Sequence, residues 1–415
     1  MTEPIILHAA DLHLGGPVAA PDPAQAGLAA RARAQALEAL VALTRRVGAR
    51  VVLLAGDVFH SPTPPLAAVA LLERALAAWA ASGVRVFLAP GNHDPFTPDA
   101  VWASLPLPAG VTVFPPEGGG VDLPEEGLWV AGAAHAAPRV TQDLSPCLPP
   151  PPEGRRGVAV LHAALAGAAG SGAHEPYAPA RLADLAAGPF SYWALGHVHR
   201  PQVLGRGPLV AYAGALQAAH PGEPGLRGAR VARWDGAAWQ DEFHSLAPLC
   251  FWSLTLADLA QVTSPGELVG RVAAGLPAGA GAGAGAGWCL RLTLAGPSPL
   301  AGRPGLGPAL AETLRQELGL GGLGLDISRL RPPGDPAALA REPHVLGRFL
   351  ALAREAAADP AILAELAREL ETRLHPLHRG LDPADRAERL AGLLDQAAHL
   401  GLRDLWQGGE GPDEA

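Results

Sequence analysis

The sequence predicts an α/β protein, because strand-like and helix-like segments alternate along its first half. Five short apolar runs predict strands, at residues 5–9, 51–55, 84–89, 157–161 and 192–195. Between them, residues 29–47 and 65–82 carry apolar residues at helical spacing. Such an alternation is what a sheet layered with helices requires.

Residues able to bind metal ions follow each predicted strand. The five segments are Asp11-Leu12-His13, Gly56-Asp57-Val58-Phe59-His60, Gly91-Asn92-His93-Asp94, His162 and Gly196-His197-Val198-His199. One Asp-x-His pair is common in a long sequence, whereas five such segments are not. Side chains at neighbouring strand ends converge on one crevice. Oxygen and imidazole ligands suit two divalent ions about 3.5–4 Å apart, and Asp57 is the natural bridging carboxylate.

The chain continues as strands after His199, at residues 209–212, 229–234 and 239–243, which places the end of the first domain at residue 247. A small α+β domain is expected at residues 248–332. Its predicted elements are strand 252–256, helix 265–274, strand 289–295, helix 308–318 and strand 324–327. The Ala-Gly tract at 278–287 is too poor in side chains to pack, so a mobile loop is expected there.

A helical region is predicted at residues 340–406, with helices at 344–358, 360–374 and 383–400. Each helix has one apolar stripe that must be buried. Two explanations stay open: the stripes pack on one another or on the preceding domain, or they dock a partner helix. Residues 407–415 are expected to be a disordered tail.

Composition limits the classes of function. At 415 residues, two or three domains are expected. The net charge of −9 argues against a free-standing protein that coats nucleic acid, although two divalent ions would add four positive charges to a nuclease site. Three widely spaced cysteines indicate neither a disulfide framework nor a thiolate zinc site, which fits a reducing cytoplasm. We find no signal peptide and no membrane-spanning run, so a cytoplasmic location without a membrane partner is expected.

Taken together, the five segments resemble those of the calcineurin-like metallophosphoesterases, over roughly residues 1–245. Within that superfamily the chain is similar to the SbcD-type DNA repair exonucleases, closest to their YhaO-like branch. This similarity rests on the sequence at residues 8–14, His60, the sequence at 212–217 and the long C-terminal extension. The resemblance implies a four-layer αββα sandwich, a small α+β domain that caps the active site, and a helical C-terminal region that binds a partner.

The resemblance also implies roles for the ligands. One metal would be held by Asp11, His13, Asp57 and His199, and the other by Asp57, Asn92, His162 and His197. Manganese is the metal it implies, and iron or zinc also suits this donor set. A metal-bridging hydroxide would then attack the phosphorus directly.

Three further residues would act on the substrate. His93 would protonate the leaving oxygen, Asp94 would hydrogen-bond the His93 imidazole, and His60 would position the phosphodiester. The chain departs from the family pattern at Ala213 and Ala215, where proline and serine are usual, so a hydroxyl contact to phosphate is absent. The nine remaining histidines lack ligand spacing and are expected to be structural or at the surface, with His8 in the core and His135 in a strand-end loop.

Three functions fit these observations. The leading hypothesis is a metal-dependent DNA exonuclease or endonuclease of DNA repair, working with an SbcC-type coiled-coil ATPase. The alternative is a metallophosphoesterase acting on a small phosphodiester or a nucleotide, which the acidic charge favours. A scaffold without activity is disfavoured because no ligand is missing. Homodimers are common in the resembled family.

Overall fold

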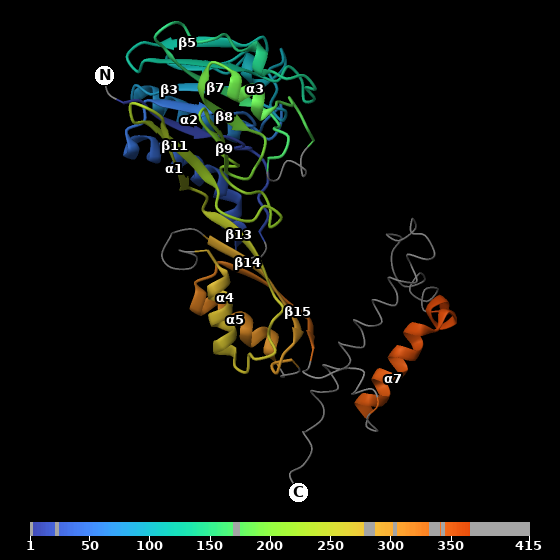
Figure 1. The fold of residues 1–415 in the computed structure, drawn as a ribbon. Helices are drawn as coiled ribbons and strands as arrows, with labels where there is room; N and C mark the ends of the chain where they lie inside the picture. The colour runs from blue at the N-terminus through green and yellow to red at the C-terminus, as the bar shows by residue number, and fades with distance from the viewer. Residues whose placement is uncertain are drawn as a thin grey trace. The chain divides into compact units, whose positions relative to one another are not determined.

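The computed structural model describes residues 3–20, 25–168, 175–277, 287–301, 305–331, 341 and 345–365 (Figure 1). It divides into two compact units: unit 1 contains residues 1–252 and 285–289, and unit 2 contains residues 253–284 and 290–415. Several predicted segments lie outside the described residues: the tract at 278–286, the chain at 366–374, the helix at 383–400 and the tail at 407–415.

The first sheet of unit 1 has six strands. Their order is β12 (Trp239–Ser245), β11 (Gly228–Trp234), β1 (Ile5–Ala9), β2 (Val51–Leu54), β3 (Arg85–Leu88) and β4 (Val111–Val113). The pairs from β1 to β4 are parallel, and β11 pairs antiparallel with β1 and β12. Helices α1 (Ala26–Val47) and α2 (Leu66–Ala81) cover one face, where Leu37 and Leu76 are buried with Leu7 and Val52.

The second sheet also has six strands. Their order is β5 (Gly119–Leu123), β6 (Leu128–Ala133), β7 (Arg156–His162), β8 (Phe190–Gly196), β10 (Leu209–Tyr212) and β9 (Gln202–Arg206). The four central strands run parallel, and both edge strands pair antiparallel. Helix α3 (Leu182–Ala187) packs on the outer face, where Leu185 lies with Phe190 and Trp193. Two short 3-10 helices, η2 (Val101–Ala103) and η3 (Ser145–Cys147), lie in connecting loops.

The two sheets pack face to face. Ile6, Leu53 and Phe87 of the first sheet are buried in one cluster with Val160 and Tyr192 of the second. Because side chains alternate along a strand, Ile6 faces the second sheet while its neighbour Leu7 faces the helices. The layers are therefore helix, sheet, sheet and helix, and the predicted four-layer sandwich is confirmed.

Unit 2 combines a β-sheet with α-helices. Its three-stranded sheet has the order β13 (Leu249–Leu256), β14 (Gly287–Pro297) and β15 (Gly322–Arg331), and the first residues of β13 and β14 belong to unit 1. Helix α4 (Pro265–Gly275) begins with a capping box between Ser264 and Glu267 and contacts α5 (Leu306–Leu318), which packs on β15. Helix α7 (Val345–Ala358) follows, and the use of its region by a partner stays a prediction.

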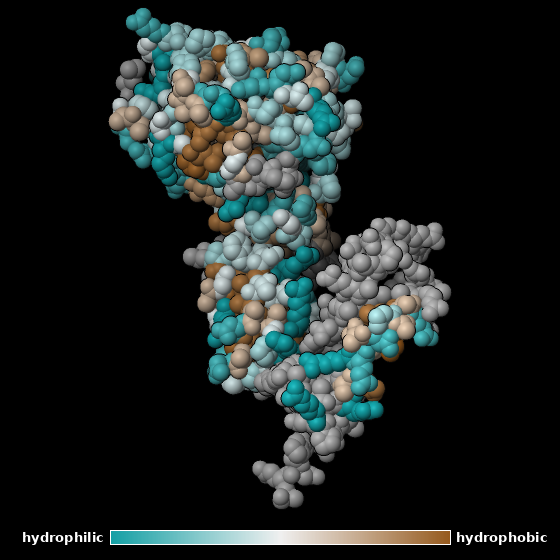
Figure 2. Space-filling model, turned by 45° about the vertical axis from the view of Figure 1, so that its right-hand side comes forward, coloured by the Kyte–Doolittle hydropathy of each residue, from teal (hydrophilic) through white to brown (hydrophobic). Residues whose placement is uncertain are grey.

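Hydrophobic side chains are mostly inside. The large ones that stand exposed in the described part of unit 1 are Leu66, Leu107 and Leu226, and in unit 2 Leu352 and Ile362. The face in Figure 2 is largely hydrophilic, with hydrophobic residues gathered in one area of unit 1. Within the described part of the chain, no helix is long and apolar enough to cross a membrane.

Candidate metal centre

Both sheets deliver the predicted ligands, and they do so at strand ends. The segments after β1, β2 and β3 carry the residues between Asp11 and Asp94, all from the first sheet. His162 ends β7, and the pair His197 and His199 follows β8, both in the second sheet. Because the carboxyl ends of parallel strands share one edge, the two sheets together surround the site.

The backbone is strained at these positions. Five non-glycine residues of the described chain have positive φ: Asp11 (50°), His13 (46°), Asp57 (49°), Ala178 (42°) and His197 (100°). Four of the five are predicted ligands, and such a conformation costs on the order of 1–3 kcal/mol each. Neighbouring glycines allow the close approach, because a Cβ at Gly91 would overlap the Asp57 carboxylate and one at Gly56 the His162 ring.

One group of donors contains Asp11, His13 and His199, whose ligand atoms lie within 4.8 Å of one another. The Nε2 atoms of His13 and His199 are 3.2 Å apart, and His199 Nε2 is 3.8 Å from Asp11 Oδ1. Asp57 Oδ2 lies 3.8 Å from His13 Nε2. These four residues are the ones predicted to hold the first metal.

The second group centres on His162. Its Nε2 lies 3.4 Å from Asp57 Oδ2 and 2.9 Å from Asn92 Oδ1. Asp57 is therefore near donors of both groups, as a bridging ligand requires. The His197 ring is 5.2 Å from that of His162, and its Nε2 donates to the carbonyl oxygen of Glu175 at 2.8 Å. All seven predicted metal ligands thus gather in one place.

Backbone contacts orient these ligands. Asp57 Oδ1 accepts the His93 N–H at 2.9 Å, and both Asp11 oxygens lie 3.2 Å from the His197 N–H. His162 Nδ1 donates to the carbonyl oxygen of Ala55 at 3.0 Å. A proton held on Nδ1 leaves the Nε2 lone pair facing Asp57, which is the form that binds metal.

Burial shifts the pKa values of the predicted ligands in a way that favours binding of a cation. Burial raises the pKa of Asp11 to about 7 and that of Asp57 to about 6, since few positive groups offset the buried charge. Burial also lowers the pKa of His13 and of His162 well below the usual value, so both rings are neutral. His13 Nδ1 is buried without a hydrogen-bond partner. Buried carboxylates and neutral imidazoles fit a site for divalent ions.

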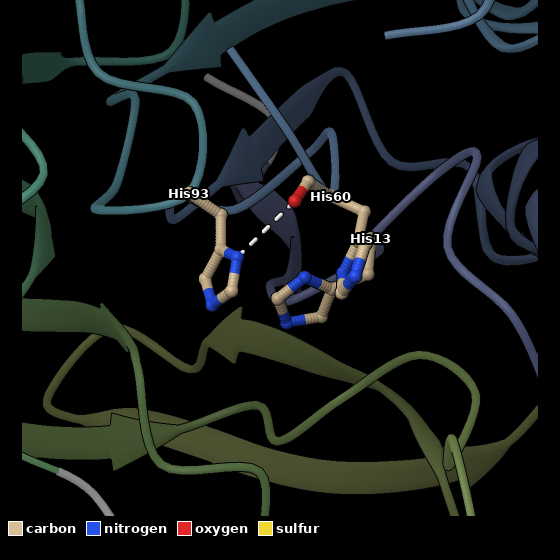
Figure 3. A group of neighbouring side chains, drawn as sticks. All are labelled: His13, His60 and His93. Carbon is tan, nitrogen blue, oxygen red and sulfur yellow. Dashed lines mark hydrogen bonds between the residues drawn. The ribbon is translucent and has the colours of Figure 1, made fainter. Parts of the chain in front are cut away.

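His60 and His93 lie beside the first group, as Figure 3 shows. Their rings are stacked, with centroids 5.3 Å apart, and the His60 ring lies 5.5 Å from that of His13. His93 Nδ1 donates to the carbonyl oxygen of His60 at 3.2 Å (Figure 3). The ligand atoms of His13, His60 and His93 also lie within 4.8 Å of one another. His60 is exposed and His93 partly so, which leaves both rings open to a substrate.

The hydrogen bond expected between Asp94 and the His93 imidazole is a prediction that the structure corrects. The Asp94 carboxylate instead accepts the backbone N–H groups of Gly91, at 2.8 Å, and Phe59, at 3.0 Å. Asp94 is fully buried, and its backbone oxygen accepts the Trp102 indole N–H at 2.6 Å. Asp94 therefore fixes the turn that carries Asn92 and His93, and the carbonyl of His60 orients the His93 ring.

Two residues of the site carry no sequence motif. Glu223 Oε1 accepts from His199 Nδ1 at 2.5 Å. Burial alone would raise the pKa of Glu223, but the hydrogen bond and charge of His199 lower it to about 2. Arg33, buried on α1, donates to the carbonyl oxygens of Leu12, Gly16 and Pro17. The sequence feature that could have identified Arg33 is the placement of an arginine on the apolar face of a predicted helix.

The remaining histidines in the described part of the chain are either structural or at the surface, where His220 is exposed. His8 lies in the core, as predicted, with Nδ1 3.0 Å from the Tyr192 hydroxyl. His135 is buried, and its Nε2 donates to the carbonyl oxygen of His162. Ala213 and Ala215 are buried beside the site, and Ala215 N–H donates to the carbonyl oxygen of His199. Five histidines lie outside the described residues: His174, His344, His375, His378 and His399.

Residues 5–201 match the model of the family described as calcineurin-like phosphoesterase. The uncharacterized metallophosphoesterase YhaO of Bacillus subtilis (strain 168) is 26% identical over 313 residues, which cover 72% of this chain and 73% of that protein.

Two solved structures are also similar. The crystal structure of TT1561 of Thermus thermophilus aligns over 58% of this chain and 99% of that chain, at 13% identity and a TM-score of 0.35. A dimetal phosphatase from Danio rerio aligns over 59% of this chain and 99% of that chain, at 11% identity and a TM-score of 0.35.

Proposed function

We propose that the chain is a DNA repair nuclease, and the proposal starts from the match of residues 5–201 to the model of the calcineurin-like phosphoesterase family. The family match and the donor groups support a metal-dependent phosphoester hydrolase. The observation that carries the finer proposal is the exposed His60, stacked on His93 at 5.3 Å. A diester has two large substituents, so its site must be open on one side, and these rings lie on such a side.

The chemistry follows from the donors and the two stacked rings. Divalent ions, when bound, lower the pKa of a water molecule and neutralise the charge on the phosphate. Manganese is the proposed metal, and iron or zinc suits the same donors. His93 gives its Nδ1 hydrogen to the His60 carbonyl, so its Nε2 is the atom that protonates the leaving oxygen. The His60 ring holds the phosphodiester next to it. The residues that would hold the ions are Asp11, His13, Asp57, Asn92, His162, His197 and His199.

The proposal includes a partner. A chain with a net charge of −9 has little basic surface for DNA. An SbcC-type coiled-coil ATPase bound to residues 340–406 would supply that surface, and residues 248–332 would restrict which DNA ends enter. A pull-down of the full-length chain with such an ATPase tests the first of these two roles.

Incubation with manganese and end-labelled DNA tests the function. We expect the purified protein to cut duplex or single-stranded DNA, and Asp57→Ala to lose this cutting, because Asp57 lies between both donor groups. Removal of the metal by a chelator should also stop the reaction, and added manganese should restore it. If the wild-type protein and Asp57→Ala are equally inactive on every DNA, the nuclease proposal is wrong.

A second candidate is a hydrolase of a small phosphodiester or a nucleotide, which the acidic net charge favours. The same assay separates the two when a chromogenic diester is run in parallel. Turnover of the chromogenic diester without any DNA cutting would favour the small substrate. Absence of both activities, with manganese bound, would contradict hydrolysis altogether.

A further inference from the structure

A carboxylate from the loop after β10 reaches a predicted ligand of the first metal. Glu223 Oε1 accepts a hydrogen bond from His199 Nδ1 at 2.5 Å, and its Oε2 accepts the Ala219 N–H at 2.7 Å. The side chains of His199 and Glu223 are only 19% and 14% exposed. With one contact on each oxygen and little access to water, the carboxylate is held in one orientation.

We infer that Glu223 is a positioning residue that selects the metal-binding tautomer of His199. A hydrogen on Nδ1, given to Glu223, leaves the lone pair of Nε2 free. That Nε2 lies 3.8 Å from Asp11 Oδ1 and 3.2 Å from His13 Nε2, so the lone pair points into the first donor group. A carboxylate behind a histidine ligand both orients the ring and makes it a better donor. The inference rests on the proposed function, because it assigns a role within the same centre.

Two of the other predicted ligand histidines are held by backbone carbonyl groups. His162 Nδ1 and His197 Nε2 donate to the backbone carbonyl oxygens of Ala55 and Glu175, at 3.0 and 2.8 Å. Those acceptors are neutral, whereas Glu223 brings a full negative charge next to the first group. The first ion would therefore gain an electrostatic contribution from Glu223. The two ions are expected to bind with unequal affinity, the tighter one beside His199.

Manganese titration of the metal-free, full-length protein by calorimetry tests this role. Wild type should bind two ions, and Glu223→Ala should bind one of them about 10–100-fold more weakly. Glu223→Gln should lie between, because its amide oxygen still accepts the Nδ1 hydrogen without the charge. Glu242→Gln is the matched control: its carboxylate lies 3.3 Å from His244 on β12, so the same change there should leave both affinities unchanged.

Electron paramagnetic resonance of bound manganese gives a second readout that a loss of stability would not reproduce. At two equivalents of metal, wild type should show a coupled pair of ions, and Glu223→Ala should show mostly single ions. Wild-type affinity for both ions in Glu223→Ala would overturn the inference and leave the proposed function intact. Equal loss of both ions would also overturn it, as the sign of a structural role. A wild-type protein that binds no manganese contradicts the proposed function, and this inference with it.

Discussion

At the scale of single residues, the predicted metal ligands occupy positions that oppose folding. Asp57 is 2% exposed, has a φ of 49°, and has a carboxyl pKa that burial raises to about 6. An aspartate with a raised pKa stabilises the fold only while it is protonated, and this contribution is lost as the pH rises through about 6. In the metal-free protein at alkaline pH, the ionised carboxylate is therefore a cost to stability.

Replacing this carboxylate should stabilise the metal-free protein. Asn at position 57 can still accept the His93 N–H, yet carries no charge. In the presence of a chelator at pH 8, we expect Asp57→Asn to raise the free energy of unfolding by roughly 1–3 kcal/mol, since one pKa unit corresponds to about 1.4 kcal/mol. The difference should shrink as the pH falls from about 6 to about 4, where the unfolded aspartate also takes up its proton.

Urea unfolding at several pH values measures this, with Asp99→Asn as a control on an exposed aspartate. Saturating manganese should reverse the order, because only the wild type gains the binding energy. A metal-free Asp57→Asn that is less stable than wild type at pH 8 would contradict the expectation.

The predicted ligands could be identified from the sequence, but not all of the residues that orient them through hydrogen bonds. Asp11, Asp57 and His162 could be predicted because each follows an apolar run that ends at one sheet edge. The role of Asp94 was wrong, because adjacency to His93 in the sequence says nothing about where its carboxylate points. Glu223 stands 24 residues after His199 in a loop without periodicity, so no pattern marks it.

At the scale of elements, hydrogen bonds from helix α1 connect it to the loop that carries His13. The buried Arg33 donates to the carbonyl oxygens of Leu12 at 2.9 Å, Gly16 at 3.1 Å and Pro17 at 3.3 Å. Three contacts from one guanidinium on residues 12–17 restrict a loop in which His13 already has a φ of 46°. The helix thus contributes to the geometry of the first donor group without holding a ligand.

Arg33→Met should loosen that loop while keeping much of the apolar stem. We expect the free energy of unfolding to fall by roughly 1.5–3 kcal/mol, because carbonyl groups lose a charged donor, and manganese affinity at the first group to fall as well. Chemical unfolding and calorimetry measure both effects. Arg45→Met on the exposed side of the same helix is the control. Unchanged metal affinity in a folded Arg33→Met would show that α1 does not position His13.

Every strand that leads to a predicted ligand was itself predicted from the sequence, to within two residues at each end. β1 and β10 match their predicted bounds, and α1 begins three residues earlier than expected. Strands β4, β5, β6 and β9 were not predicted. β4 has only three residues, and β9 is polar and half-buried, so neither shows an apolar run. The pairing of two sheets followed from the family resemblance rather than from periodicity, which cannot say which strands are neighbours.

At the scale of the whole molecule, both sheets of unit 1 contribute residues to the site. Asp57 Oδ2, from the first sheet, lies 3.4 Å from His162 Nε2 of the second. Ions bound by such donors would connect the sheets in addition to the apolar layer between them. A ligand at 100 times its dissociation constant stabilises the folded state by about 2.7 kcal/mol.

Hydrogen exchange followed by mass spectrometry tests this connection. Manganese should slow exchange at the ends of β1, β2 and β3 and also at the ends of β7 and β8, because each sheet supplies ligands. Helices α4 and α5 of unit 2 should exchange at the same rate with and without the metal. Protection confined to one sheet would contradict a centre shared by both.

The spread of the site along the chain has a consequence for how the protein is made. The donors begin at Asp11 and the supporting carboxylate is Glu223, with β7 and β8 in between. A ribosome must therefore extrude just over half of the 415 residues before a complete centre exists. Until then the growing chain lacks a complete metal site, so the proposed hydrolytic activity can appear only late in translation.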